Sequence, residues 1–172
     1  MRYAVRLSKD DNGTVLATVP DVPEAITYGD TKAEALERVV EAILTVFDER
    51  IRARQRIPPA TTAGRTTVEI PVLEAAKVAL YQTMGEQRVT KAELGRRLKV
   101  HMPQVDRILN IRHASQMGQV VSAFSALGKR VEFNIVDAPR PLPGFIASVG
   151  KRPARVASRA TSGRVLRAAK KR

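Results

Sequence analysis

The sequence contains no cysteine and only two histidines. The lack of cysteine excludes a disulfide framework and a thiolate metal site, and any metal site would have to rest mostly on carboxylates. No such constellation is recognisable, so we expect neither a metal nor a cofactor. The amino terminus lacks the apolar core of a secretory signal, and no apolar run reaches the roughly eighteen residues of a membrane span. These absences predict a soluble cytoplasmic protein without a membrane partner.

Acidic residues are missing from the last part of the chain. Residues 138–172 carry ten basic and no acidic side chains, whereas residues 1–49 carry five basic and ten acidic ones, a net charge of −5. Residues 50–86 and 87–137 carry +3 and +5, so that the 172 residues together carry +13. An acidic amino-terminal unit is therefore joined to basic ones, which suggests two partners of opposite charge. This length can bury one good core or two small ones.

The first part of the chain has the pattern of a small sheet. Apolar and polar residues alternate over 2–7 and again over 14–19, which predicts two strands. The Asn-Gly pair at 12–13 tolerates positive φ and favours an antiparallel hairpin between them. A third short strand is expected over 25–28.

One long helix should cover this sheet and close an α+β core. Thr31 and Glu34 form a capping box at its start. Residues 58–65 read PPATTAGR, which predicts a loop, and Thr67 to Ile70 can add a further strand. The buried stripe expected for the helix consists of Leu36, Val40, Ile43, Phe47 and Ile51.

The most informative stretch runs from Thr90 to Asn110, in the helical unit that begins at Pro71. Thr90 and Glu93 form a second capping box, and Pro103 suits the first turn of another helix. Two short helices broken by a tight turn in a basic setting are typical of a helix-turn-helix. The apolar residues at helical spacing in this stretch are Leu94, Leu98, Val105, Ile108 and Leu109. The helical unit that begins at Pro71 includes Val72, Ala75, Val78, Ala79 and Met84 before this stretch.

The second helix of this pair offers a polar face that suits the major groove of DNA. We expect Gln104 and Arg107 to contact base edges, with Asn110 on the same face. His101 and His113 flank the helix, each as a phosphate neighbour or a surface residue rather than a general base. Phosphate contacts are expected from Lys91, Arg96, Lys99 and Arg112.

Asp106 is an acidic residue on this otherwise polar and basic face. Three roles remain open for it: it could orient Arg107, orient Arg97, or accept a hydrogen bond from cytosine. The bland alternative for the whole region is a helical hairpin with a solvated polar face. The agreement of capping, spacing and charge favours DNA binding.

A third helix over 115–127 should end at Gly128, which suits a left-handed cap. Val131, Phe133 and Ile135 then alternate in a final strand, which we expect to pair with the same strand of a second subunit. The remaining tail, 138–172, has the composition of a disordered segment. Two roles stay open for it: holding DNA phosphates without reading sequence, or only aiding solubility.

Two segments resemble the HicB family of antitoxins. VPDVPEAITYGDTKAEALERVVEAI, residues 19–43, is similar to the family's amino-terminal domain, with a short hairpin, a P-D-x-P turn and G-D-T before a helix. QVDRILNIRHASQMGQVVSAFSALGKRVEFNI, residues 104–135, resembles the DNA-binding domain of the longer members. Two motifs in the expected order are more specific than either alone. The basic tail has no counterpart in this pattern.

The resemblance implies an antitoxin of a type II toxin–antitoxin system. Residues 1–70 would form a small partial ribonuclease-H-like domain that binds and neutralises a HicA-type mRNA-cleaving ribonuclease. Residues 71–137 would carry the helix-turn-helix, bind operator DNA as a homodimer or higher even oligomer, and repress the operon. Lys99 stands where such turns usually have a glycine, and His101 stands where a Ser or Thr cap is common.

Two other functions compete with this one. A ribonuclease-H-like fold invites catalysis, but active relatives hold metals with carboxylates on the first strand, and residues 3–7 contain none. Asp10 and Asp11 fit solvated turn residues better than metal ligands, so we do not expect an enzyme. The leading alternative is a stand-alone transcriptional regulator whose amino-terminal domain senses a ligand or a protein.

Overall fold

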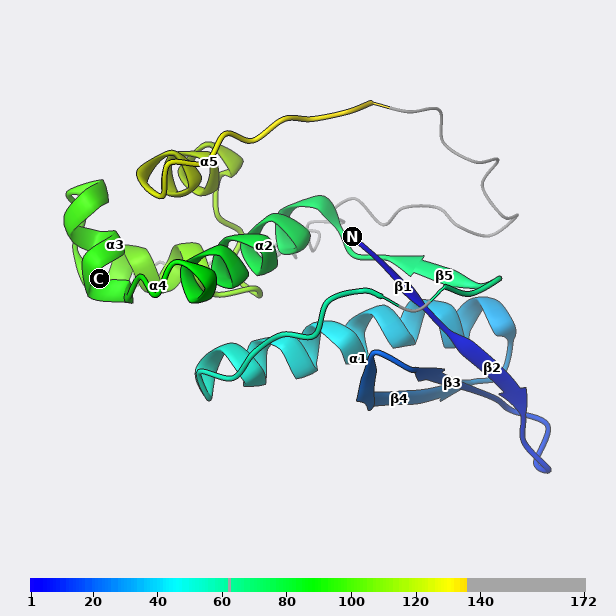
Figure 1. Ribbon diagram of the computed structural model, residues 1–172. Coiled ribbons are helices and arrows are strands. Elements are labelled where there is room, and N and C mark those ends of the chain that lie inside the picture. The colour runs from blue at the N-terminus through cyan, green and yellow to red at the C-terminus, as the bar shows by residue number, and fades with distance from the viewer. Residues whose placement is uncertain (62, 136–172) are drawn as a thin grey trace, which may run out of the picture. The chain divides into compact units, whose positions relative to one another are not determined.

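The structure, a computed structural model, describes residues 1–61 and 63–135 (Figure 1). The predicted tail at 138–172 lies outside the described residues. The described part is α+β, as predicted, with two small antiparallel sheets and five helices. The strands are β1 (Arg2–Ala4), β2 (Arg6–Lys9), β3 (Val15–Val19), β4 (Val22–Gly29) and β5 (Thr67–Glu69). The helices are α1 (Lys32–Arg52), α2 (Val72–Glu86), α3 (Lys91–Leu98), α4 (Met102–Leu109) and α5 (Met117–Ala126).

The first nine residues supply strands to both sheets. β1 pairs with β5, with Tyr3 opposite Val68, while β2 pairs with β3 in the order β2-β3-β4. Between β1 and β2, the Val5 N–H donates to the Thr66 carbonyl at 2.9 Å. The predicted hairpin is confirmed by the antiparallel β2–β3 pair. The strand expected at 67–70 is also present, and it pairs with β1.

α1 lies across the three-stranded sheet (Figure 1) and its apolar side chains join those of the strands in one core cluster. The stripe predicted from the sequence is wrong at Leu36 and Val40, which are only partly buried. The fully packed line starts one residue earlier. Its members are Ala35, Val39, Ile43, Leu44, Phe47 and Ile51.

The junction between β4 and α1 explains the G-D-T pattern. A Cβ on Gly29 would lie 2.5 Å from the Ala35 backbone nitrogen, so any side chain there would collide with the first turn of α1. The Thr31 hydroxyl caps the helix by accepting from the Glu34 N–H at 3.2 Å, and Glu34 Oε2 accepts from the Asp30 N–H at 2.8 Å. The predicted cap at Thr31 is confirmed, although the Glu34 carboxylate returns to the N–H of Asp30 rather than to that of Thr31 as in a full capping box. The motif fixes the direction in which α1 leaves the sheet.

The predicted loop at 58–65 contains no helix or strand among its described residues, and it is fastened to the sheet. The Asp21 carboxylate, from the P-D-x-P turn, accepts from the Thr61 N–H at 3.1 Å and from its hydroxyl at 2.9 Å. The Tyr3 hydroxyl donates to the Pro58 carbonyl at 2.8 Å. Burial raises the pKa of Tyr3 to about 12, so this donor keeps its proton at neutral pH.

α2 contributes to two core clusters. Its Val78 packs in the cluster of the sheet and α1, together with Ile111 from beyond α4. Leu80 and Met84 belong to a second cluster, formed with α3, α4 and α5. Val72, in the first turn of α2, is 66% exposed and lies outside both clusters.

α5 begins two residues later than the helix predicted at 115–127, and Gly128 after it has the expected positive φ of 69°. The strand predicted beyond it is not formed in this single chain, because no neighbouring strand supplies its ladder hydrogen bonds. Val131 is partly buried against the second cluster, whereas Phe133 and Ile135 are exposed.

Candidate nucleic-acid interface

The turn between α3 and α4 consists of residues 99–101. Lys99 occupies the left-handed region at φ 55° and ψ 42°, which a glycine adopts without steric cost. A Cβ on Gly95 would lie 3.2 Å from the Val100 carbonyl oxygen and 3.3 Å from Val105 Cγ2. The absence of a side chain at Gly95 therefore lets α3 pack closely against the turn and α4.

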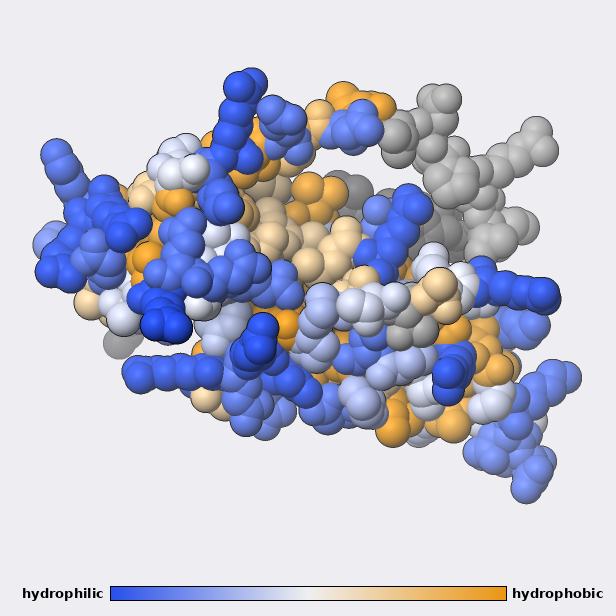
Figure 2. All heavy atoms as spheres, viewed as in Figure 1, coloured by the Kyte–Doolittle hydropathy of each residue, from blue (hydrophilic) through white to orange (hydrophobic). Residues whose placement is uncertain are grey.

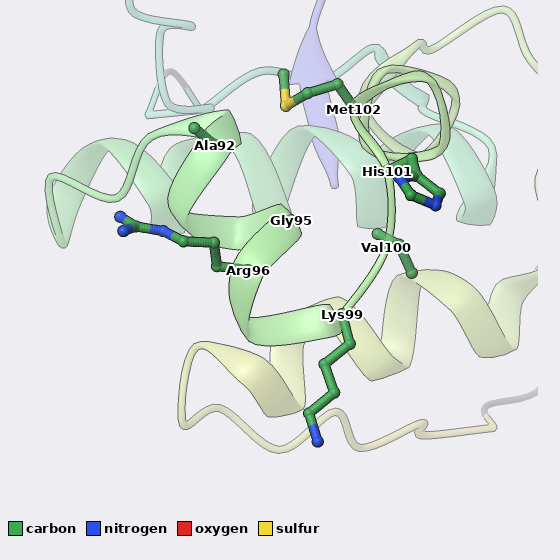
Figure 3. A pocket seen from close by; sticks show the side chains of 7 residues that line it. All are labelled: Ala92, Gly95, Arg96, Lys99, Val100, His101 and Met102. Carbon is green, nitrogen blue, oxygen red and sulfur yellow. The ribbon is translucent and has the colours of Figure 1, made fainter.

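A shallow hollow of about 390 Å³ lies along this turn (Figure 3). The long side chains of Arg96 and Lys99 extend away from the helix at its margin (Figure 3). Long, exposed cationic side chains of this kind suit contacts with phosphates. The hollow is lined by Ala92, Gly95, Arg96, Lys99, Val100, His101 and Met102.

The start of α3 has the predicted cap, with the Thr90 hydroxyl accepting from the Glu93 N–H at 3.2 Å. The Glu93 carboxylate does not return to Thr90 as in a full capping box, since it contacts Arg96 and accepts from Arg97 Nε at 2.9 Å. The hydrogen bond from Arg97, followed by the charges of both arginines, lowers the pKa of Glu93. Arg96 remains largely exposed beyond this contact.

α4 presents an exposed polar face, as the sequence predicted. The side chains of Gln104 and Arg107 are exposed and make no hydrogen bond or ion pair within residues 1–61 and 63–135. His101 occupies the N-cap position without a side-chain cap bond, as its departure from Ser or Thr suggested. Hydrophilic side chains dominate the surface over α3 and α4 in Figure 2.

Asp106 is bound to Lys91 across the two helices. The Lys91 Nζ lies 2.7 Å from Asp106 Oδ1. This partner is none of the three that the sequence suggested for Asp106, namely Arg107, Arg97 and cytosine. Both side chains are about half exposed, so solvent screens the pair. Lys91 is consequently a poorer phosphate ligand than Lys99, which forms no ion pair within residues 1–61 and 63–135.

Arg112 does not lie free for DNA phosphate either. Its guanidinium contacts α1, with Nη1 2.6 Å from Glu41 Oε2 and Nη2 2.8 Å from Thr45 Oγ1. Its backbone N–H donates to Asn110 Oδ1 at 2.9 Å, so the Asn110 side chain braces the end of α4. In the free chain Arg112 is therefore engaged with α1 and the Asn110 side chain with the backbone after α4, and the DNA contacts expected of both residues stay predictions.

Lys77 of α2 is a site residue that sequence reasoning missed. It is fully buried, and its Nζ donates to the Asn110 carbonyl at 2.7 Å and to the His113 carbonyl. Burial lowers the pKa of Lys77, and no carboxylate pairs with it among the described residues. The sequence does contain a signal for the burial of Lys77, because this residue shares a helical face with Leu73, Leu80 and Met84.

The segment after α4 is held from three sides. Ile111 is 1% exposed in the cluster of the sheet and α1, Arg112 contacts α1, and Lys77 of α2 binds the carbonyls on either side. The end of α4 is thus fixed directly to the sheet-bearing part of the chain. This attachment sets the direction in which α4 presents Gln104 and Arg107.

Groups that could hold a metal are absent from the described residues, in which no three His, Asp or Glu side chains gather. In the same residues, no helix is long and apolar enough to cross a membrane.

Residues 2–79 match the model of a family described as a HicB-like antitoxin of a bacterial toxin–antitoxin system. The sheet, α1 and the start of α2 lie within this match. Those elements therefore define the chain as a protein of the antitoxin class.

Curated relatives extend the match beyond that domain. Antitoxin HicB 2 of Photorhabdus laumondii is 39% identical over 132 residues, which cover 77% of this chain and 94% of the relative. Antitoxin HicB of Escherichia coli strain K12 is 33% identical over 138 residues, 79% of this chain and all of the relative. Antitoxin HicB of Pseudomonas fluorescens is 35% identical, covering 77% and 92%. The chain belongs to the HicB antitoxin family.

Proposed function

We propose that this chain neutralises a HicA-type mRNA-cleaving ribonuclease toxin and represses the operon that encodes both proteins, acting in the cytoplasm. The observation that carries the proposal is the extent of the matches to relatives named antitoxin HicB. These matches cover at least 92% of the three relatives described above. A chain that retains nearly the whole length of such antitoxins is expected to retain their role.

We assign toxin binding to residues 1–70, with the sheet and α1 as a partial ribonuclease-H-like domain. The acidic balance of residues 1–49 supports this assignment. A ribonuclease needs a basic surface to hold its polyanionic substrate, and an acidic protein surface can cover it with complementary charge. The same acidity makes this part of the chain unsuited to holding nucleic acid itself.

We assign operator binding to α3 and α4 as a helix-turn-helix, with α4 in the major groove. Gln104 and Arg107 are exposed side chains of the types that hydrogen-bond base edges, and Lys99 and Arg96 suit adjacent phosphates. The basic balance of residues 87–137 supports this placement. We extend the same role, without sequence specificity, to the basic residues 138–172.

A single helix-turn-helix covers few base pairs, so we propose a homodimer on a palindromic operator. Exposed Phe133 and Ile135 lie at alternating positions that can pair with the same segment of a second copy. Val131, partly buried on the second cluster, would anchor that segment. Pairing between copies would supply the ladder hydrogen bonds missing in one chain.

The test purifies the full chain from its native host and measures operator affinity for two variants. A stoichiometric small basic protein should copurify, and its absence would favour a stand-alone regulator. Arg107→Ala should relax preference at one base position per half-site at a cost of about 1–3 kcal/mol. Lys99→Ala, the matched control, should weaken all sequences alike and lower the salt slope by about one. Equal loss on operator and random DNA for Arg107→Ala would contradict its base-reading role.

A further inference from the structure

The outer face of the three-stranded sheet carries a strip of three apolar side chains, two of them exposed and one half-buried. α1 packs on the opposite face, where Val15, Ala17 and Val19 are buried. On the outer face the register pairs Leu16 of β3 with Tyr28 of β4. The next pair on the same face joins Thr18 of β3 to Ile26 of β4. Ile26 is 57% exposed and Tyr28 60%. We call Leu16, Ile26 and Tyr28 the β4 strip; apolar side chains reach the surface over this sheet in Figure 2.

Isolated exposed apolar residues are ordinary, but neighbouring ones on one sheet face mark a site of interaction. β4 is moreover an edge strand of its sheet, whose order is β2-β3-β4. The Tyr28 end of the strand is held in place. Arg38 Nη1 donates to the Tyr28 carbonyl at 3.0 Å, and its guanidinium carbon lies 5.9 Å from the centre of the Tyr28 ring. A braced aromatic side chain of this kind suits an anchor for a partner.

Acidic residues border the strip at the same end of the sheet. Val15 pairs with Lys9 on one side and with Gly29 on the other, so these three residues mark one end of the sheet. The hairpin turn with Asp10 and Asp11 follows Lys9, and Asp30 follows Gly29, so all three carboxylates lie at this end. None of these three carboxylates forms an ion pair within the part of the chain that the structure describes. Two cations also lie beside the strip: Arg6 of β2, which the register places opposite Thr18 of β3 and away from the turn, and Arg38, whose guanidinium lies over the Tyr28 ring.

We propose that the β4 strip, with its rim of Asp10, Asp11 and Asp30, is the surface on which the basic toxin docks. The inference rests on the proposed antitoxin function and identifies the residues that would face the toxin. Tyr28 and Ile26 supply the desolvated apolar centre of the interface, and the rim supplies charge complementary to an RNA-binding surface. A protein seated there has its basic surface covered by carboxylates.

Two other occupants fit less well. A second copy of this chain would place the same acidic rim against its own, and like charges in an interface oppose association. Residues 138–172 of the same chain carry the opposite charge but few large apolar side chains, so they match the rim without filling the strip. A basic globular partner satisfies both parts of the surface.

The experiment titrates the full chain with the small basic protein encoded beside it. The double variant Ile26→Ser with Tyr28→Ser should bind at least about 30-fold more weakly, the effect of losing one strong anchor. Val72→Ser, which replaces a similarly exposed residue on α2, is the matched control and should bind as the unaltered chain does. Unaltered urea unfolding of both variants would show that the fold is intact, as expected for exposed positions.

A second variant tests the rim separately. Asp10→Asn with Asp11→Asn should slow association and flatten its salt dependence, while the strip variant should mainly speed dissociation. If the unaltered chain binds the partner and the strip variant binds equally well, the surface assignment is overturned and the antitoxin function stands. If the unaltered chain does not bind it, the function itself fails. If the strip variant still binds the partner but changes its oligomeric state, the assignment of the strip to toxin docking is also overturned.

Discussion

Val39 and Val40 are adjacent residues of identical chemistry, and they test the orientation of α1. Val39 is fully buried, whereas Val40 is only partly buried against the same cluster. Val39→Ala removes two buried carbons, worth about 1.6 kcal/mol, and leaves a cavity that costs about 1 kcal/mol more. Alanine returns about half a kcal/mol through its higher helix propensity. The expected net loss in the free energy of unfolding is about 2 kcal/mol.

Val40→Ala gains the same helix propensity but loses less burial, and its partly open surroundings leave little cavity. We expect it to cost about 0.5 to 1 kcal/mol. Urea unfolding of the full chain, followed by circular dichroism, measures both values provided that the dependence on urea is unchanged. Equal costs, or a greater cost at Val40, would refute the packing of α1 described above and restore the stripe predicted from the sequence.

Three further outcomes follow from the α2–α5 region. Lys99→Gly should raise the free energy of unfolding by about 0.5 to 1 kcal/mol, by relief of left-handed strain, and still weaken DNA binding; a loss of stability would contradict this. Because burial lowers the pKa of Lys77, the unfolded chain binds the proton of this residue more tightly than the folded chain does. The free energy of unfolding should therefore rise as the pH approaches 10.5. Lys77→Met should remove this rise, which urea unfolding at neutral and alkaline pH measures. Phe133→Asp, at a 62% exposed position, should leave the fold intact but abolish the dimer in sedimentation together with operator binding.

The course of α1 could be predicted from the sequence, but its rotation could not. Apolar residues occupy neighbouring lines along this helix, one through Ala35 and Val39 and the other through Leu36 and Val40. Either line satisfies helical periodicity, and both reach the core to some degree. Which of the two lines is buried depends on how closely Gly29 at the end of β4 approaches the first turn of α1, and this approach is a property of the tertiary fold.

The same distinction applies to the candidate nucleic-acid interface. The two helices, their turn and the exposure of Gln104 and Arg107 depend on local signals, namely caps and periodicity, and could be predicted. The pairing of Arg112 with Glu41 joins residues 71 positions apart, so no local pattern contains it. The contact occupies the guanidinium of one predicted phosphate ligand in the free chain. Lys77 is different, because its apolar helical face made its burial predictable.

The attachment of the segment after α4 limits how this protein can be recombined with its relatives. A chimera joined near residue 70 would separate Arg112 from Glu41 and Ile111 from the core that receives it. The α1 side chains of the relative would then contact the segment after α4 of this chain, whose Ile111 and Arg112 pack against different residues. The domains can therefore be exchanged only if the contacts of this loop are transplanted with them, and inherited variation on the two sides of the joint should be correlated.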